Sequence, residues 1–254
     1  MTLYAIILTY NEARHIQACI ESLRFADHII VFDSFSTDDT VRIARESGVE
    51  VSQRKFDDYA GQRNAALKSV EGRADWVLFV DADERVTPEL AAEVQTAIQN
   101  PAFVAWRVPR LNCILGKLTK GAGWYPDYQT RLLKVGSAHY DPARKVHELV
   151  ILDGPEGTMR EHFIHLNYET IQQFHTKQQR YSAYDARILY QQGIHPKPQN
   201  FLLQPLRQFW WRFVTLKGFH DGWHGFRLSA LMAWYEFRKY ITLRHLWLGK
   251  VSDN

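Results

Sequence analysis

The first hundred residues alternate between short apolar runs and helical patterns, and this alternation restricts the fold more than any other feature. Four apolar runs predict buried strands, at residues 3–8, 28–32, 49–52 and 76–80. Four stretches with helical spacing predict helices, at residues 12–23, 37–47, 59–70 and 87–99. Repeated strand–helix–strand units join parallel strands through right-handed crossovers. The sequence therefore predicts an α/β fold with a mostly parallel sheet flanked by helices.

The remainder of the chain has a different pattern. Three short strands separated by Gly- and Pro-rich loops are expected at residues 103–109, 130–133 and 149–152. Three helices are expected after them, at residues 168–192, 201–216 and 225–246. We therefore expect two domains, an α/β domain over residues 1–165 and a helical C-terminal extension over residues 166–254.

Composition is that of an ordinary globular protein. Hydrophobic residues make up 46% of the 254 residues and charged residues 23%, so the chain can bury one large core. Cys19 and Cys113 are the only cysteines, which excludes a disulfide framework and favours a reducing compartment. No stretch approaches the ~20 apolar residues that a transmembrane helix requires.

Positive charge is concentrated in the C-terminal part of the chain. Residues 160–254 hold 13 Lys/Arg and 6 Asp/Glu, a net charge of +7, whereas residues 1–159 hold 18 and 22, a net charge of −4. The same C-terminal part carries five of the eight tryptophans. A basic, aromatic-rich segment indicates an anionic partner, which is a membrane surface, a nucleic acid or a phosphorylated lipid.

Two carboxylates follow the apolar run at residues 76–80. Asp81 and Asp83 stand one residue apart at the carboxyl end of a predicted parallel strand, which is where open α/β sheets bind ligands. Carboxylates this close repel each other unless positive charge lies between them, and a Mg²⁺ or Mn²⁺ ion that bridges a diphosphate is the usual solution. The alternative is a solvated acidic turn, because Asp-x-Asp alone is a weak signal.

Polar residues also follow the first two predicted strands. Thr9 and Glu12 come after the first strand, and Asp33 directly follows the second. Such side chains can bind a nucleotide base or ribose, and Asp33 can accept a hydrogen bond from the imide N–H of uracil. The alternative at both places is helix capping and turn formation.

Taken together, these segments resemble the nucleotide-sugar glycosyltransferases of family 2, which have the Rossmann-like GT-A fold. The matching segments occur in the family's order and at its spacing, at residues 9–12, 33–40, 62–64 and 76–84. Phe35 and Asp39 depart from the residues that are common in the family, which affects one loop. Four later segments look like those of bacterial lipopolysaccharide-core β-glucosyltransferases, at residues 124–127, 129–132, 145–148 and 218–222.

The resemblance implies an inverting, metal-dependent transfer of a hexose, expected to be glucose, from a UDP-sugar to a saccharide on a lipid carrier or lipopolysaccharide core. It implies a nucleotide-binding half at residues 1–100 and an acceptor half at residues 101–165. The residues expected to bind the donor are Thr9, Glu12, Asp33, Arg63, Asp81, Arg131 and Lys177. The expected ligands of Mn²⁺ or Mg²⁺ are Asp83, Asp81 and His165, with a structural role as the alternative for His165.

An inverting transfer also needs one base that deprotonates the acceptor hydroxyl. The carboxylates available in the acceptor half are Asp127, Asp141 and Glu148. Glu148 is preferred because the pair with His147 matches the position of the family's base, and His147 would orient it. The alternatives are that this pair is an exposed strand edge, and that Asp127, close to Trp124, binds acceptor hydroxyls instead.

The helices after residue 198 predict peripheral attachment to an anionic membrane at its cytoplasmic face. Aromatic and basic side chains alternate at residues 209–213 and 234–240, as at bilayer interfaces. The alternatives are packing on the catalytic domain and a homodimer interface. A non-catalytic nucleic-acid-binding protein and a metal-dependent nucleotidyltransferase are the rival functions. Acidic strand ends argue against the first, so we expect no nucleic acid partner, and the lack of a Gly-rich phosphate loop argues against the second.

Overall fold

A computed structural model describes residues 1–143 and 149–249, and these residues form two compact units. The first unit comprises Met1–Arg110 and Asp127–His165, and the second comprises Leu111–Pro126 and Leu166–Asn254. One border between the two units thus falls between residues 165 and 166. The segment Leu111–Pro126, which the sequence placed in the acceptor half, belongs to the helical unit instead, because Ile114 and Trp124 pack there in an apolar cluster.

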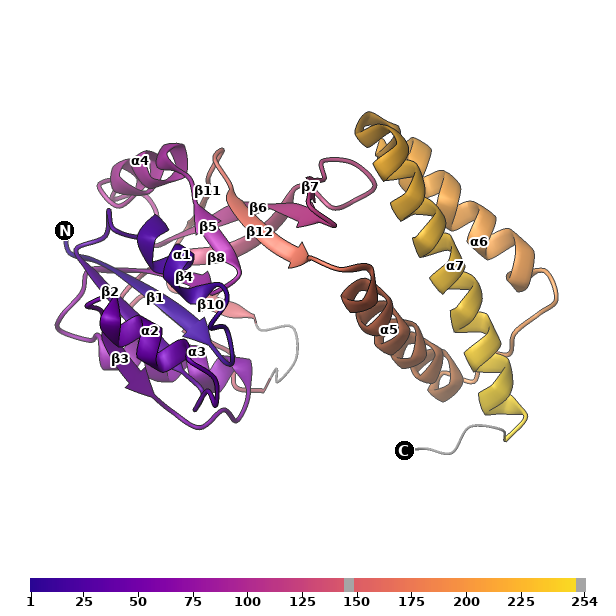
Figure 1. Ribbon diagram of the computed structural model, residues 1–254, viewed down its shortest axis with the longest axis horizontal. Helices are drawn as coiled ribbons and strands as arrows, with labels where there is room; N and C mark the ends of the chain where they lie inside the picture. The colour runs from indigo at the N-terminus through magenta and orange to yellow at the C-terminus, as the bar shows by residue number, and fades with distance from the viewer. Residues whose placement is uncertain (144–148, 250–254) are drawn as a thin grey trace. The chain divides into compact units, whose positions relative to one another are not determined.

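Ten strands form one sheet, with the order β3-β2-β1-β4-β8-β6-β12-β5 and with β7 and β11 both paired to β6 (Figure 1). Its first four strands are parallel, β1 Leu3–Thr9, β2 His28–Asp33, β3 Glu50–Gln53 and β4 Trp76–Asp81. The others are β5 Glu84–Val86, β6 Ala105–Ile114, β7 Lys117–Leu118, β8 Asp127–Lys134, β11 Glu156–Thr158 and β12 Phe163–Tyr168. Two further strands form a separate pair, β9 Ala138–Tyr140 and β10 Val150–Leu152. The predicted parallel sheet is confirmed, and β8 extends it antiparallel to β4.

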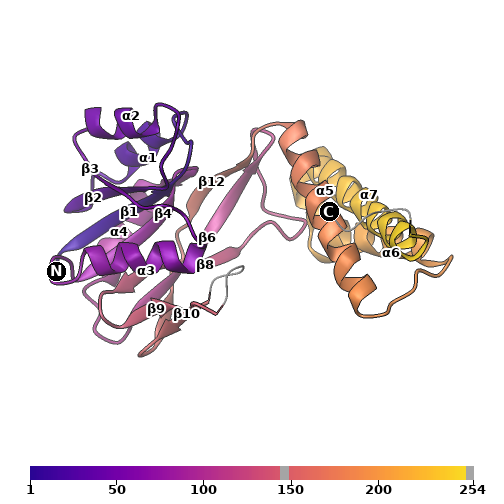
Figure 2. The ribbon, with the colours of Figure 1, turned by 90° about the horizontal axis from the view of Figure 1, so that it is seen from below.

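Helices cover both faces of the parallel strands. They are α1 Ile16–Ser22, α2 Thr40–Glu46, α3 Tyr59–Ser69 and α4 Pro88–Ala97. Alternate residues of β1 point to opposite faces, so Ile7 packs in one core cluster with α1 and α4 while Ile6 packs in another with α3. Figure 2 shows α3 on the opposite side of these strands from α1 and α2. Thr87 caps α4 by accepting the Leu90 N–H at 3.2 Å.

The second unit is helical apart from β7 and the ends of β6 and β12. It contains α5 Ile171–Gln191, α6 Asn200–Trp210, a π-helical turn η1 Trp211–Thr215, a 3₁₀ turn η2 Gly218–Asp221 and α7 Gly222–Trp247. Helix α7 packs against both α5 and α6. The core between α5 and α7 is aromatic, with Phe174 close to Tyr168 and Tyr235. Within the described part of the chain, no helix combines the length and apolar character needed to span a membrane.

Candidate active site

Three neighbouring parallel strands end at one edge of the sheet, and each end carries polar side chains. Strand β1 lies between β2 and β4, with Thr9 opposite Asp33 and Leu8 opposite Asp81. The strand order reverses between β1 and β4, and such a switch point is where open α/β sheets bind ligands. Thr9 and Asp33 are buried, whereas the side chain of Asp81 is 30% exposed. The structure therefore gathers these three predicted residues at one edge of the sheet.

Asp33 is held by the loop after its own strand. Its carboxylate accepts hydrogen bonds from the Ser36 backbone N–H at 2.9 Å, from the Ser36 hydroxyl and from Gln53 Nε2 at 3.0 Å. A uracil imide N–H would have to share or replace one of these donors. The loop itself is tied to the end of β1, because Asn11 Oδ1 accepts the Thr37 N–H at 2.8 Å.

Two buried arginines bind Asp81. Asp81 Oδ1 lies 3.2 Å from Arg63 Nη2, and Oδ2 lies 2.5 Å from Arg131 Nη2. The side chains of Arg63 and Arg131 are only 2% and 6% exposed, so water screens these pairs weakly. Burial raises the pKa of the Asp81 carboxyl, but the guanidinium groups of Arg131 and Arg63 hold it below its usual range. These arginines supply the positive charge that we expected from a metal ion beside Asp81.

Glu84 and Arg110 extend the charged network to Asp127. The fully buried Glu84 accepts the Asp81 backbone N–H at 2.9 Å, and its Oε1 lies 3.5 Å from Arg110 Nη1. Burial and the nearby charge of Asp81 raise the pKa of Glu84. Arg110 Nε donates to Asp127 Oδ2 at 2.9 Å because the two residues are opposite each other in the β6–β8 ladder. We call the resulting network the strand-end charge cluster, which consists of Arg63, Asp81, Glu84, Arg110, Asp127 and Arg131.

Asp83 and His165 face each other beside this cluster. His165 Nε2 lies 3.4 Å from Asp83 Oδ2, because antiparallel pairing of β5 with β12 places His165 opposite Glu84. Two ligands of one octahedral ion are about 3 Å apart, so both atoms can face a single Mg²⁺ or Mn²⁺. Among the residues that the structure describes, no group of three or more His, Cys, Asp or Glu could hold a metal. An ion here would therefore need oxygen atoms of a substrate or of water as further ligands.

Two other predicted donor-binding residues, Glu12 and Lys177, have different contacts. Glu12 follows β1, and its backbone N–H donates to Thr40 Oγ1 at 2.8 Å. Lys177 belongs to the second unit, on α5, where its Nζ lies 3.4 Å from Asn167 Oδ1. The predicted base Glu148 and its partner His147 lie outside the described residues.

Sequence analysis missed the roles of Glu84 and Arg110. Glu84 stands in the acidic run 81–84, but its burial under Asp81 depends on the turn between β4 and β5. Arg110 stands near the end of a predicted strand, and only the antiparallel register with β8 brings it to Asp127. The one available signal was an arginine and an aspartate next to two predicted strands, and it was too weak to pair them.

Comparison with known families now identifies the chain. The family model described as glycosyl transferase family 2 matches residues 4–137, which is more than half of the chain and includes the whole strand-end charge cluster. The chain belongs to glycosyl transferase family 2. Its α/β architecture is the GT-A fold of this family, as the sequence resemblance predicted.

Family 2 relatives match beyond the region of the family model. An uncharacterised glycosyltransferase of Rickettsia bellii is 31% identical over 259 residues, which cover 95% of this chain and 86% of the relative. The lipopolysaccharide core biosynthesis glycosyltransferase LpsC of Rhizobium meliloti is 29% identical over 255 residues, which cover 92% of this chain and 91% of LpsC. Both alignments therefore extend into the helical unit.

Solved structures resemble this family 2 chain less closely. A structure of S. aureus TarS, residues 1–349, matches 100% of this chain and 93% of its own at 14% identity, with a TM-score of 0.49. Glucosyl-3-phosphoglycerate synthase of Mycobacterium tuberculosis, solved with Mn²⁺ and UDP, matches 43% of this chain and 44% of its own at 23% identity, with a TM-score of 0.38. These scores are too low to transfer functional detail.

Proposed function

We propose that this family 2 enzyme transfers a hexose, with glucose as the first candidate, from a UDP-sugar to a saccharide of a lipopolysaccharide core or on a lipid carrier, with inversion. The strand-end charge cluster carries the proposal, because it combines fixed carboxylates and arginines at the switch point of a GT-A sheet. The similarity to LpsC over 92% of the chain supports the lipopolysaccharide core as acceptor.

The donor would lie along the ends of β1, β2 and β4. Asp33 accepts the uracil imide N–H, while Thr9 and Glu12 contact the uridine. Arg63 and Arg131 orient Asp81 towards the ribose, and their positive charge favours a diphosphate nearby. Because Arg131 already binds Asp81, it acts on the donor mainly by positioning that carboxylate. The contact between Lys177 and the diphosphate stays a prediction from the sequence.

Asp83 and His165 would hold a Mn²⁺ or Mg²⁺ ion, since their facing atoms fit two positions of one coordination sphere. When bound, the ion neutralises charge on the UDP leaving group. Glu84 stabilises the turn that carries Asp83, because its carboxylate accepts the backbone N–H of Asp81. The chain's own contribution is thus a preformed arrangement of two ligands.

Glu148, oriented by His147, is proposed as the base. Asp127 is less suited to take a proton, because Arg110 binds its Oδ2 and Gln129 Nε2 donates to its Oδ1 at 2.9 Å. Glu148→Gln should lower the transfer rate by about 10²–10⁴-fold with donor affinity unchanged. Asp127→Asn should mainly raise the KM for the acceptor. Measurements of kcat, KM and UDP affinity would move the role to Asp127 if the two variants show the reverse pattern.

A panel of nucleotide sugars tests the proposed function. The full chain with Mn²⁺ is mixed with each donor, and thermal stability and release of the nucleoside diphosphate are measured. UDP-glucose should raise the midpoint of unfolding most, because a ligand that binds only the native state stabilises it. Pyrophosphate release from nucleoside triphosphates would favour a nucleotidyltransferase. Nucleic acid binding without any response to a nucleotide sugar would favour a binding protein.

Exposed aromatic side chains of the helical unit favour a second part of the proposal, peripheral attachment to an anionic membrane at its cytoplasmic side. Trp223 is 72% exposed and Trp210 is 64% exposed. Phe209, Phe213 and Phe226 instead pack on one another, so only part of the aromatic content is available to a partner. Exposed apolar and basic side chains of the same unit include Leu202, Leu203, Leu206, Trp211, Trp234, Arg207, Arg227 and Arg238. Tryptophan at the interface and arginine at anionic headgroups are the expected contacts.

Vesicle co-sedimentation tests this attachment. Replacing Arg207, Arg227 and Arg238 together with glutamine should lower binding to anionic vesicles, by about 1 kcal/mol per charge near the surface. High salt should release only part of the bound protein, since buried tryptophan adds a salt-resistant contribution.

A control variant removes three exposed charges of the first unit, Arg45, Lys68 and Arg160. Equal loss in both variants would contradict a specific membrane face. No binding by the unchanged protein at low salt, together with concentration-dependent dimers, would assign the aromatics to a homodimer interface.

A further inference from the structure

The turn between β4 and β5 carries Asp83, and Arg85 binds this turn from the strand that follows it. Only Ala82 and Asp83 separate the two strands. Arg85 Nη1 donates to the Ala82 carbonyl oxygen at 2.8 Å and to the Glu84 carbonyl oxygen at 2.7 Å. One acceptor precedes Asp83 and the other follows it. A single guanidinium group therefore spans the residue that is proposed to bind the metal.

The same guanidinium group ties the turn to helix α1. Arg85 Nη2 donates to the carbonyl oxygen of His15, the N-cap residue of α1, at 3.1 Å. Helix α1 also holds the strand after the turn, because Ser22 Oγ accepts the Val86 N–H at 3.2 Å. Within the described residues, every hydrogen bond of Arg85 goes to a backbone carbonyl oxygen. Its side chain therefore holds the main chain in place.

Burial around the turn leaves the Asp83 side chain accessible. Ala82 and Glu84 are buried on either side, whereas the Asp83 side chain is 32% exposed and its Oδ2 faces His165 Nε2 at 3.4 Å. A metal ligand must be held within about 0.5 Å of its coordinating position, which requires hydrogen bonds to the residues around it. Arg85 supplies two such bonds, one on each side of Asp83.

A guanidinium group suits this task better than an ammonium group. Arginine presents five N–H donors in one rigid plane, so a single side chain can bind three carbonyl oxygens at once. Lysine carries a point charge on a flexible stem and fixes the direction of its acceptors less strictly. Replacement of Arg85 with lysine should therefore keep the charge but loosen the turn.

We propose that Arg85 is a positioning residue, which sets the Asp83 carboxylate for metal binding through the backbone of the β4–β5 turn. The inference rests on the proposed function, in which Asp83 and His165 hold a Mn²⁺ or Mg²⁺ ion. It adds to that function a residue that acts through the main chain and not as a ligand.

Electrostatics and positioning predict opposite effects when Arg85 is removed. A guanidinium group repels a divalent cation, so loss of its charge alone would strengthen metal binding. Loss of its hydrogen bonds to the turn would weaken metal binding, by about 10–100-fold for a group that orients a ligand. Arg85→Met removes both the charge and the hydrogen bonds. The direction in which Mn²⁺ affinity changes therefore distinguishes the two effects.

Thermal unfolding of the full chain, measured against Mn²⁺ concentration at saturating UDP, gives the test. The Mn²⁺ concentration that produces half of the maximal shift should rise about 10–100-fold in Arg85→Met and about 3–10-fold in Arg85→Lys. The affinity for UDP without metal, measured by titration calorimetry, should stay the same in both variants. In transfer assays, saturating Mn²⁺ should restore most of the rate, because the ligand itself is still present.

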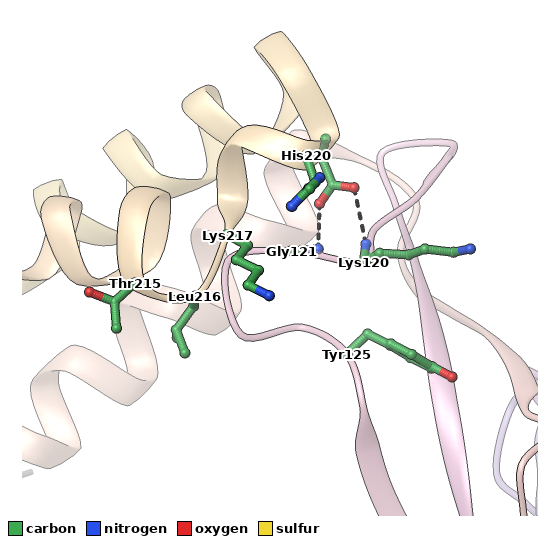
Figure 3. A pocket seen from close by; sticks show the side chains of 8 residues that line it. Lys120, Gly121, Tyr125, Thr215, Leu216, Lys217 and His220 are labelled. Carbon is green, nitrogen blue, oxygen red and sulfur yellow. Dashed lines mark hydrogen bonds between the residues drawn. The ribbon is translucent and has the colours of Figure 1, made fainter.

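Two control variants separate this effect from a general loss of stability. Arg24→Met removes an arginine of the same unit whose Nη2 donates to the Ser47 carbonyl oxygen at 2.8 Å, outside the β4–β5 turn. Asp221→Asn removes a charge in the helical unit, where Asp221 lines a pocket and accepts the backbone N–H groups of Lys120 at 3.1 Å and of Gly121 at 2.7 Å (Figure 3). Each control should change the half-saturating Mn²⁺ concentration by less than about twofold.

The outcomes distinguish failure of this inference from failure of the proposed function. A wild-type protein without any Mn²⁺-dependent shift would refute the metal assignment of Asp83, and the role of Arg85 with it. A normal wild-type response, with equal or tighter Mn²⁺ binding in Arg85→Met, would overturn the role of Arg85 alone. An equal loss of Mn²⁺ affinity in Arg24→Met would do the same. If Arg85→Met does not fold, wild-type Mn²⁺ affinity in Arg85→Lys would also overturn it.

Discussion

Replacing Asp83 with asparagine is expected to abolish most metal-dependent sugar transfer while leaving the fold intact. Asparagine has the same shape but no charge, so it replaces the carboxylate that faces His165 with a neutral amide, which binds a divalent cation more weakly. A bound metal contributes several kcal/mol to stabilising charge in the transition state, which corresponds to roughly 10²–10⁴-fold in rate. The transfer rate at saturating UDP-sugar and Mn²⁺ measures this effect.

A second measurement does not depend on turnover. Mn²⁺ together with UDP should raise the thermal midpoint of the wild type, and this shift should be lost in Asp83→Asn. Asp153→Asn is the matched control, because Asp153 is exposed in the same unit. Wild-type turnover and an unchanged Mn²⁺-dependent shift in Asp83→Asn would refute the assignment.

Replacing Arg131 with methionine is expected to give the largest loss of stability. Methionine keeps much of the apolar length of the side chain but leaves Asp81 and Glu84 with one positive neighbour fewer. Removing one partner of a buried ion pair costs about 3–5 kcal/mol, because the other charge stays buried without it. We expect about 2–3 kcal/mol here, since Asp81 is 30% exposed and keeps Arg63 as a partner. Urea unfolding measures the change.

Two further variants define the cause of that loss. Arg45→Met removes an exposed arginine of the same unit and should change stability by less than about 0.5 kcal/mol. Asp81→Asn combined with Arg131→Met should be less destabilising than the sum of the two single changes, because the unpaired charge is gone. Additive effects would mean that the arginine acts through packing and not through its charge.

The sequence predicted the parallel half of the sheet because its strands are continuous apolar runs. Strands β1, β2 and β4 lie within one residue of their predicted bounds. Strands β5 and β11 were not predicted, since three residues carry no readable periodicity and exist only through pairing with β12 and β6. The helix predicted at residues 12–23 begins later, at Ile16, because Asn11 adopts a positive φ in the preceding turn.

In the candidate site, too, local sequence patterns were predictive, whereas contacts between distant segments were not. Residues at the ends of parallel strands could be grouped from sequence, because neighbouring parallel strands end at one edge. The charged partners of Asp81 could not be identified from the sequence in this way. Arg63 comes from α3 and Arg131 from β8, and the β6–β8 ladder contains a register shift at Trp106 and Arg107 that no pattern in the sequence indicates. The electrostatic partners of Asp81 therefore followed from helix packing for Arg63 and from antiparallel strand pairing for Arg131, neither of which a sequence pattern provides.

The path of the chain between the two units limits how the protein can be dissected. It passes from one unit to the other three times, after Arg110, after Pro126 and after His165. A polypeptide that stops at His165 would still carry residues 111–126, but without Tyr168, Phe174 and the other apolar side chains that cover Ile114 and Trp124. In this fragment, residues 111–126 would expose apolar side chains that favour aggregation. A fragment designed to stay in solution would therefore also need residues 111–126 replaced by a short polar linker.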